Sequence, residues 1–313
     1  MSSEARQTHS PPAGRLTRVI RGRLQKPLRV ILYATDGLGK STFASKAPSP
    51  IFLGAEDGTA QLDVERMPEL ESWQDILSSV DELTTAEHAY KTIVLDTADW
   101  AEPMCWAHVA REANKKNIEE LPYGRGYSAA LDQWRILLSK LERLRNTCDM
   151  HVVILAHTWV KLFKNPEEAG DFDRYEMKLH AKASGLLREW ADCVLFGNYE
   201  TYTHEANGRT KGISTGARVI HTQRRAAFDA KNRFDLPETL PLDWDAFAEA
   251  VAAHRPGDPT LLKQRIATML ESVNDSLKAK VFAALSTAGN DAAELARIAS
   301  KLSGHIVTQE TST

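Results

Sequence analysis

Residues 34–41 read Ala-Thr-Asp-Gly-Leu-Gly-Lys-Ser, the pattern of a phosphate-binding loop with alanine in place of its first glycine. Gly37 and Gly39 let the backbone turn its N–H groups toward phosphates, and Lys40 supplies a cation for the terminal phosphates. Ser41 is expected to hold Mg²⁺, and the helix that begins there adds its positive end. The loop therefore predicts an ATP- and Mg²⁺-binding site, with a chance match in an ordinary loop as the alternative. The residues expected to bind the nucleotide are Asp36, Gly37, Leu38, Gly39, Lys40, Ser41 and Thr42.

Short apolar runs recur along the chain, and several are continuous rather than alternating in hydrophobicity. Such runs are typical of strands that are covered on both faces of a parallel sheet. They occur at 28–33, 51–53, 92–96, 151–156, 193–196 and 218–221. Helical patterns lie between them, at 98–113, 128–145 and 182–191. This alternation predicts an α/β fold with a mostly parallel sheet between helices.

Changes in composition divide the chain into three parts. Residues 1–27 are polar and basic, and we expect a flexible arm there. The α/β pattern occupies residues 28–250, and a cluster of prolines and glycine follows it. Residues 260–303 are expected to form a small C-terminal unit of two or three short helices.

The composition is ordinary for a soluble globular protein, with 42% hydrophobic and 26% charged residues and a net charge of −3. Overall charge therefore gives no argument for nucleic-acid binding. The 3 cysteines form no CxxC pair, which argues against a zinc site or a disulfide framework. No apolar run is long enough to span a membrane, and we expect no secretory signal because the first residues contain no apolar stretch. We therefore expect a cytoplasmic protein with no membrane partner.

Two acidic residues complete the expected ATPase site. Asp96 ends the apolar run 92–96. Its carboxylate is expected to hold Mg²⁺ together with Ser41. Hydrolysis also requires a base that activates water, and Thr97 rather than a glutamate follows Asp96. We therefore assign the base to Glu56, which follows an earlier apolar run; a loop residue without catalytic function is the alternative. Asp99 is interpreted as a helix N-cap.

The pair Ala55-Glu56, the His157 that follows an apolar run, and Lys231-Asn-Arg-Phe234 together resemble the RecA-like ATPases. In that family the glutamate is catalytic and a polar residue at the position of His157 senses the γ-phosphate. The resemblance spans about residues 28–250 and is nearest to phage-encoded nucleotide-binding proteins, some of which anneal single strands. It implies a RecA-like P-loop core that uses ATP and Mg²⁺, forms homo-oligomers and works in a bacterial host's cytoplasm. The residues assigned to catalysis are Lys40, Glu56, Asp96 and His157.

The residues after His157 are expected to form a loop that binds single-stranded DNA, as the corresponding loop does in recombinases of this family. Trp159 can stack on bases, while Lys161 and Lys164 can contact phosphates. Acidic residues within 158–175 would repel the DNA backbone unless they face away from it.

A second basic segment, residues 209–233, is opposed only by one aspartate. It could contact DNA phosphates, or it could supply a cation to the nucleotide of a neighbouring subunit. A solvated basic face is the alternative. The residues assigned to these contacts are Arg224, Arg225, Lys231 and Arg233.

We therefore expect an ATPase, stimulated by single-stranded DNA, that acts in phage-type recombination or strand annealing. The alternatives are an ATP-dependent DNA-binding module without significant hydrolysis and a hexameric helicase-type motor. A small-molecule phosphotransferase ranks last, because no lid of clustered arginines is evident. A single-strand-binding protein is one candidate partner of the C-terminal unit.

Overall fold

The computed structural model describes residues 26–302, except 57, 165–169, 207–208, 255–258, 271–272, 293 and 300. The expected basic arm therefore lies almost wholly outside the described residues. Within them, no helix combines the length and the apolar character that crossing a membrane requires.

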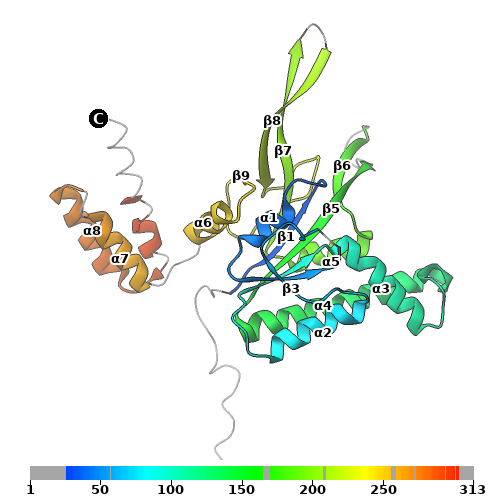
Figure 1. Ribbon diagram of the computed structural model, residues 1–313. Coiled ribbons are helices and arrows are strands. Elements are labelled where there is room, and N and C mark those ends of the chain that lie inside the picture. Colours follow the sequence, from blue (N-terminus) through cyan, green and yellow to red (C-terminus); the bar gives the residue numbers. More distant parts are fainter. Residues whose placement is uncertain are drawn as a thin grey trace, which may run out of the picture.

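One mostly parallel sheet forms the centre of the fold, with strand order β3-β2-β4-β5-β1-β7-β8-β9 and with β6 paired to β5 (Figure 1). Pairings among β1 to β5 and between β1 and β7 are parallel, while β6, β8 and β9 add antiparallel pairs. The strands are β1 (Arg29–Ala34), β2 (Pro50–Gly54), β3 (Glu65–Arg66), β4 (Thr92–Asp96), β5 (His151–Phe163), β6 (Phe172–Met177), β7 (Cys193–Ala206), β8 (Arg209–His221) and β9 (Thr239–Pro241). The α/β prediction is confirmed.

Helices cover both faces of this sheet (Figure 1). They are α1 (Lys40–Ser45), α2 (Trp73–Thr85), α3 (Ala98–Glu112), α4 (Arg125–Cys148), α5 (Ala181–Trp190) and α6 (Trp244–His254), with short 3₁₀ turns at Ile118–Glu120 and Pro122–Gly124. Ile31 and Tyr33 of β1 pack in the core with α2 to α5, whereas Val30 and Leu32 pack in a second core with α1 and α6. Alternate side chains of a strand point to opposite faces, so β1 is apolar on both faces from Val30 onward.

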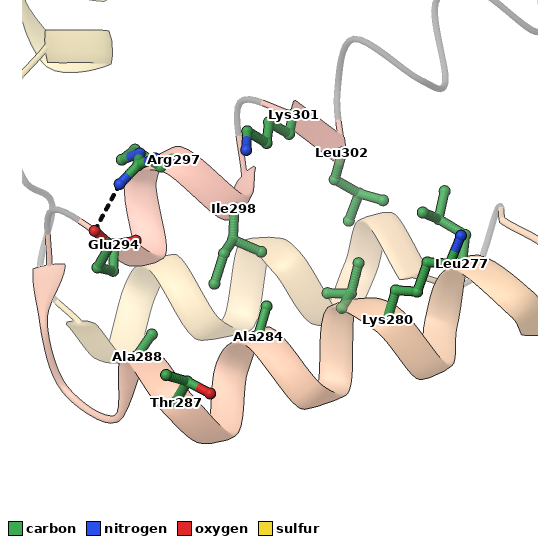
Figure 2. Close-up of a pocket in the computed structure, with 11 residues that line it drawn as sticks. Leu277, Lys280, Ala284, Thr287, Ala288, Glu294, Arg297, Ile298, Lys301 and Leu302 are labelled. Atoms are coloured by element: carbon green, nitrogen blue, oxygen red, sulfur yellow. Dashed lines mark hydrogen bonds and ion pairs between the residues drawn. The ribbon is translucent and has the colours of Figure 1, made fainter.

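The C-terminal region is helical, as predicted, and includes α7 (Pro259–Leu270) and α8 (Asp275–Ala288). Its apolar side chains form a separate cluster around Ile266 and Leu295. A cavity of about 450 Å³ opens between α8 and the segments 294–299 and 301–302 (Figure 2). Apolar groups dominate its lining, together with the cations of Lys280 and Lys301 and the ion pair of Arg297 with Glu294. The independence of this region as a domain stays a prediction.

The described part of segment 158–175 is mostly strand rather than loop, so this expectation was wrong. Residues Thr158 to Phe163 extend β5 beyond the sheet and pair with β6 in an antiparallel hairpin. The apolar run ends at Ala156, and the polar and aromatic residues that follow give no buried-strand pattern. These residues form a strand because they pair with β6, although their local sequence does not predict one.

Candidate functional site

The predicted phosphate-binding loop connects the end of β1 to the start of α1. Gly37 and Gly39 adopt positive φ angles of 68° and 108°, which glycine accepts without steric cost. Leu38 between them is buried, so only its backbone can contact a ligand. A Cβ on Gly197 of β7 would lie 2.8 Å from the Leu38 side chain. Gly197 therefore allows the loop to lie against β7, a requirement that sequence reasoning missed because the two segments are distant along the chain.

Lys40 and Ser41 begin α1 and face the end of β4. Lys40 is only 6% exposed, and burial lowers the pKa of its ammonium despite the carboxylates nearby. The Ser41 hydroxyl donates to Asp96 Oδ2 at 2.6 Å. Asp36 and Thr42, also expected at the nucleotide, are both exposed on the solvent side of the loop and of α1.

The residues expected to hold Mg²⁺ are thus brought together although 55 positions separate them. Asp96 is completely buried, and its Oδ1 has no hydrogen-bond partner among the described residues. A buried acceptor without a partner is costly, and Mg²⁺ prefers oxygen ligands such as this carboxylate and the Ser41 hydroxyl. The pair therefore fits a Mg²⁺ ion, which when bound would neutralise charge on the nucleotide phosphates.

Glu56 reaches the same end of the sheet because β2 and β4 pair in parallel, with Gly54 opposite Asp96. The backbone N–H of Ala55 continues this pairing and donates to the Asp96 carbonyl at 2.7 Å. Burial raises the pKa of the Glu56 carboxyl, with smaller contributions from neighbouring carboxylates. A carboxyl with a raised pKa is a stronger base when ionised, which suits the expected role in activating water.

His157 lies beside this carboxylate, at the point where β5 leaves the parallel sheet. Its Nε2 is 3.9 Å from Glu56 Oε1 and 3.6 Å from Asp36 Oδ1. The Asp99 carboxylate accepts hydrogen bonds from both the His157 backbone N–H, at 2.8 Å, and the ring Nδ1, at 2.9 Å. The bond to Asp99 raises the pKa of the His157 ring and fixes Nδ1 as a donor.

Asp99 is not the N-cap of α3, so this interpretation was wrong. The N-cap is Thr97, and Asp99 lies within the first turn. Burial would raise the pKa of the Asp99 carboxyl, but its hydrogen bonds from His157 outweigh burial and lower it. Asp99 orients the histidine instead of capping the helix, a role that becomes visible only once α3 packs against β5.

A model of the AAA domain family matches residues 26–234, two thirds of the chain and all of this site. The chain belongs to this AAA domain family. Its structure is similar to that described as the crystal structure of the RadB recombinase, with 11% identity, 69% of this chain and 86% of that chain covered, and a TM-score of 0.37. No curated protein matches the chain significantly.

The hairpin of β5 and β6 extends this AAA domain beyond the site (Figure 1). Trp159 is 38% exposed, and the Lys161 ammonium lies 3.9 Å from the centre of its ring. Lys164 is exposed just after β5. The hairpin also exposes Val160 and Leu162. An aromatic ring with cations beside it is the kind of surface that binds single strands, although DNA binding stays a prediction.

The four residues expected to contact DNA or a neighbouring subunit lie outside the phosphate-binding loop, and each has a partner elsewhere in the same chain. Lys231 donates to the carbonyls of Arg188 and Glu189 at the end of α5, at 2.8 and 3.2 Å. The other three are in ion pairs: Arg224 with Asp229 at 3.4 Å, Arg225 with Glu238 at 2.7 Å, and Arg233 with Asp192 at 3.7 Å. The three arginines are also at least half exposed, so contacts outside the subunit stay a prediction for them.

Glu102, one turn after Asp99 on α3, is a buried acid that sequence reasoning missed. It is 4% exposed and accepts hydrogen bonds from the His180 backbone N–H at 3.0 and 3.2 Å. Burial raises the pKa of its carboxyl from 4.5 to about 7. Between these values the folded protein holds a proton that the unfolded chain releases, so stability falls as pH rises through this window.

We expect Glu102→Gln to remove this loss of stability. At each pH, the difference between the free energies of unfolding of the two proteins is measured. From pH 5 to pH 8 this difference should change by up to about 3 kcal/mol, because the unsubstituted protein loses stability and the variant does not. Urea denaturation at several pH values measures the difference. Glu82→Gln, at an exposed position of α2, is the control and should show no such trend. A constant difference between the Glu102 variant and the unsubstituted protein would contradict the raised pKa.

Proposed function

We propose that this protein hydrolyses ATP and acts on single-stranded DNA, in recombination or strand annealing of the phage type. The observation that carries the proposal is the course of β5. This one strand places His157 beside the nucleotide site and continues directly into the exposed hairpin of Trp159 and Lys161. Nucleotide chemistry and a DNA contact would then share a single structural element.

Each residue of the site has a separate role in the transfer of the terminal phosphoryl group to water. Lys40 and the backbone N–H groups of the loop stabilise negative charge on the phosphates. Ser41 and Asp96 would hold Mg²⁺ through their side-chain oxygens. Glu56 accepts a proton from the attacking water. The Nε2 atom of His157, which lies 3.9 Å from Glu56 Oε1, would donate a hydrogen bond to the terminal phosphate.

His157 also couples the nucleotide to the hairpin. Its carbonyl accepts a hydrogen bond from the Lys178 N–H at 2.9 Å, which closes the base of the hairpin just beyond β6. Its ring and backbone N–H are held by Asp99. A strand of DNA bound at Trp159 would shift this base and with it the histidine, so hydrolysis responds to DNA.

The proposal includes assembly into a homo-oligomer, with the exposed arginines at 224, 225 and 233 facing DNA or a neighbouring nucleotide. A single-strand-binding protein is proposed as the partner of the C-terminal helices. The apolar cavity beside Lys280 and Lys301, where the acidic side chain of Glu294 is paired with Arg297, suits an acidic, partly apolar segment of such a partner (Figure 2).

The test is the rate of ATP hydrolysis across a titration with a single-stranded oligonucleotide at low salt. We expect the rate to rise with DNA, and we expect Trp159→Ala to weaken DNA binding by about tenfold, the effect of losing one stacked base. Phe282→Ala, which removes an exposed aromatic side chain from α8, is the control and should bind DNA normally. An unchanged rate with DNA, together with no binding at low salt, would overturn the proposal.

A further inference from the structure

Arg218 on β8 lies beside the phosphate-binding loop, although it is remote from it in sequence. Two positions later on the same strand, Ile220 is fully buried in the core that packs on α1. Side chains two apart on a strand share a face, so Arg218 points to the side of the sheet that carries α1. It is paired with Tyr199, two residues beyond the Gly197 that contacts the loop. Arg218 therefore lies at the level of the loop itself.

The Arg218 guanidinium approaches the loop at Gly39. Its Nη1 is 3.1 Å from the position that a Cβ on Gly39 would occupy, closer than a side chain there would allow without a shift. The Arg218 backbone is held in β8 by its pairing with β7 and by a hydrogen bond from the Leu242 N–H at 2.9 Å. Gly39 thus admits the guanidinium as well as providing the positive φ angle of the turn.

The carboxylates around the loop outnumber its cations, so the guanidinium of Arg218 can contribute positive charge there. Four carboxylates attract the Lys40 ammonium electrostatically and favour its charged form: Glu56, Asp36, Asp96 and Asp99. The Arg218 side chain, in contrast, forms no ion pair with any residue in the described part of the chain and is exposed. A bound triphosphate adds further negative charge beside these carboxylates, and an unpaired guanidinium next to the loop can offset it.

We propose that Arg218 is a nucleotide-binding residue that acts within its own subunit and donates its guanidinium N–H groups to the phosphates of ATP. The inference rests on the proposed nucleotide site and adds to it a cation that lies outside the loop. The planar guanidinium can bind two phosphate oxygens at once, which the ammonium of a lysine cannot do. Arg218 is therefore a specific requirement and not an interchangeable positive charge.

The test is the affinity for ATP and ADP, measured by calorimetry or with a fluorescent nucleotide analogue. We expect Arg218→Ala to raise the Kd for both by about tenfold or more, the usual effect of losing a charge-assisted hydrogen bond. Arg218→Lys should recover only part of this loss. Arg135→Ala, which removes an exposed arginine of α4, is the control and should bind as the unsubstituted protein does.

Lys40→Ala separates this inference from the proposed function. If Lys40→Ala abolishes binding while Arg218→Ala binds within twofold of the unsubstituted protein, the role of Arg218 is overturned and the nucleotide site stands. If the unsubstituted protein does not bind ATP, the proposed function itself fails. Circular dichroism of both variants, matching that of the unsubstituted protein, confirms that a loss of affinity is not a loss of fold.

Mixing the two variants tests whether Arg218 acts within its own subunit. A mixture of Arg218→Ala and Lys40→Ala subunits should show no more ATP binding than the sum of its components. Binding above that sum would mean that Arg218 serves the nucleotide of a neighbouring subunit, which would overturn the assignment within one chain.

Discussion

Replacing Glu56 with glutamine is expected to lower the rate of ATP hydrolysis by about 100- to 10,000-fold, the range over which a positioned base contributes. ATP binding should persist, because the amide keeps the size of the side chain and removes a charge that would repel the phosphates. The Glu56 side chain is 19% exposed and lies beside His157, so little else in the site should change. Single-turnover hydrolysis and nucleotide affinity, measured on the same preparation, separate the two effects.

The dependence of hydrolysis on pH gives this prediction a second readout. Burial raises the pKa of Glu56 above 4.5, and a base acts only when it is ionised. Activity should therefore be lost, as pH falls, at higher pH than for an ordinary glutamate, and kcat/KM reports this for the free enzyme. Glu69→Gln, at an exposed position, is the matched control and should keep full activity. Normal hydrolysis by the Glu56→Gln variant would show that Glu56 is a loop residue without catalytic function.

Replacing Lys40 with alanine is expected to reduce ATP hydrolysis by about 100- to 1,000-fold, the effect of removing one preorganised group that stabilises transition-state charge. The loss should include binding, because Lys40 is the buried cation among several carboxylates and the phosphates would meet those carboxylates without it. Initial rates over a range of ATP concentrations separate the change in KM from that in kcat.

Lys46→Ala is the matched control for this prediction. Lys46 follows the same helix, α1, but it is half exposed and forms an ion pair with Asp243 away from the loop. Its removal should leave hydrolysis unchanged. Hydrolysis that survives the loss of Lys40, or that falls equally with Lys46, would contradict the assignment of residues 34–41 as the phosphate-binding loop.

The sequence by itself determined the parts of the site that lie within short segments. The loop with Lys40 and Ser41 is a run of consecutive residues, and its glycines reveal the backbone geometry directly. The continuous apolar runs indicated strands that are buried on both faces, and these runs led to Asp96 and Glu56 at the strand ends. The proximity of these residues also follows from the predicted fold class, since parallel strands end at one edge of the sheet.

The tertiary structure alone decided which distant side chains join that edge. Asp99 holds His157 because α3 packs against β5, and Arg218 reaches Gly39 because β8 pairs with β7 beside the loop. The hairpin after His157 depends likewise on pairing with β6. Such contacts depend on strand register and helix packing, which sum many weak interactions across the whole chain. No local pattern encodes them, whereas a phosphate-binding loop is encoded by the few residues that form it.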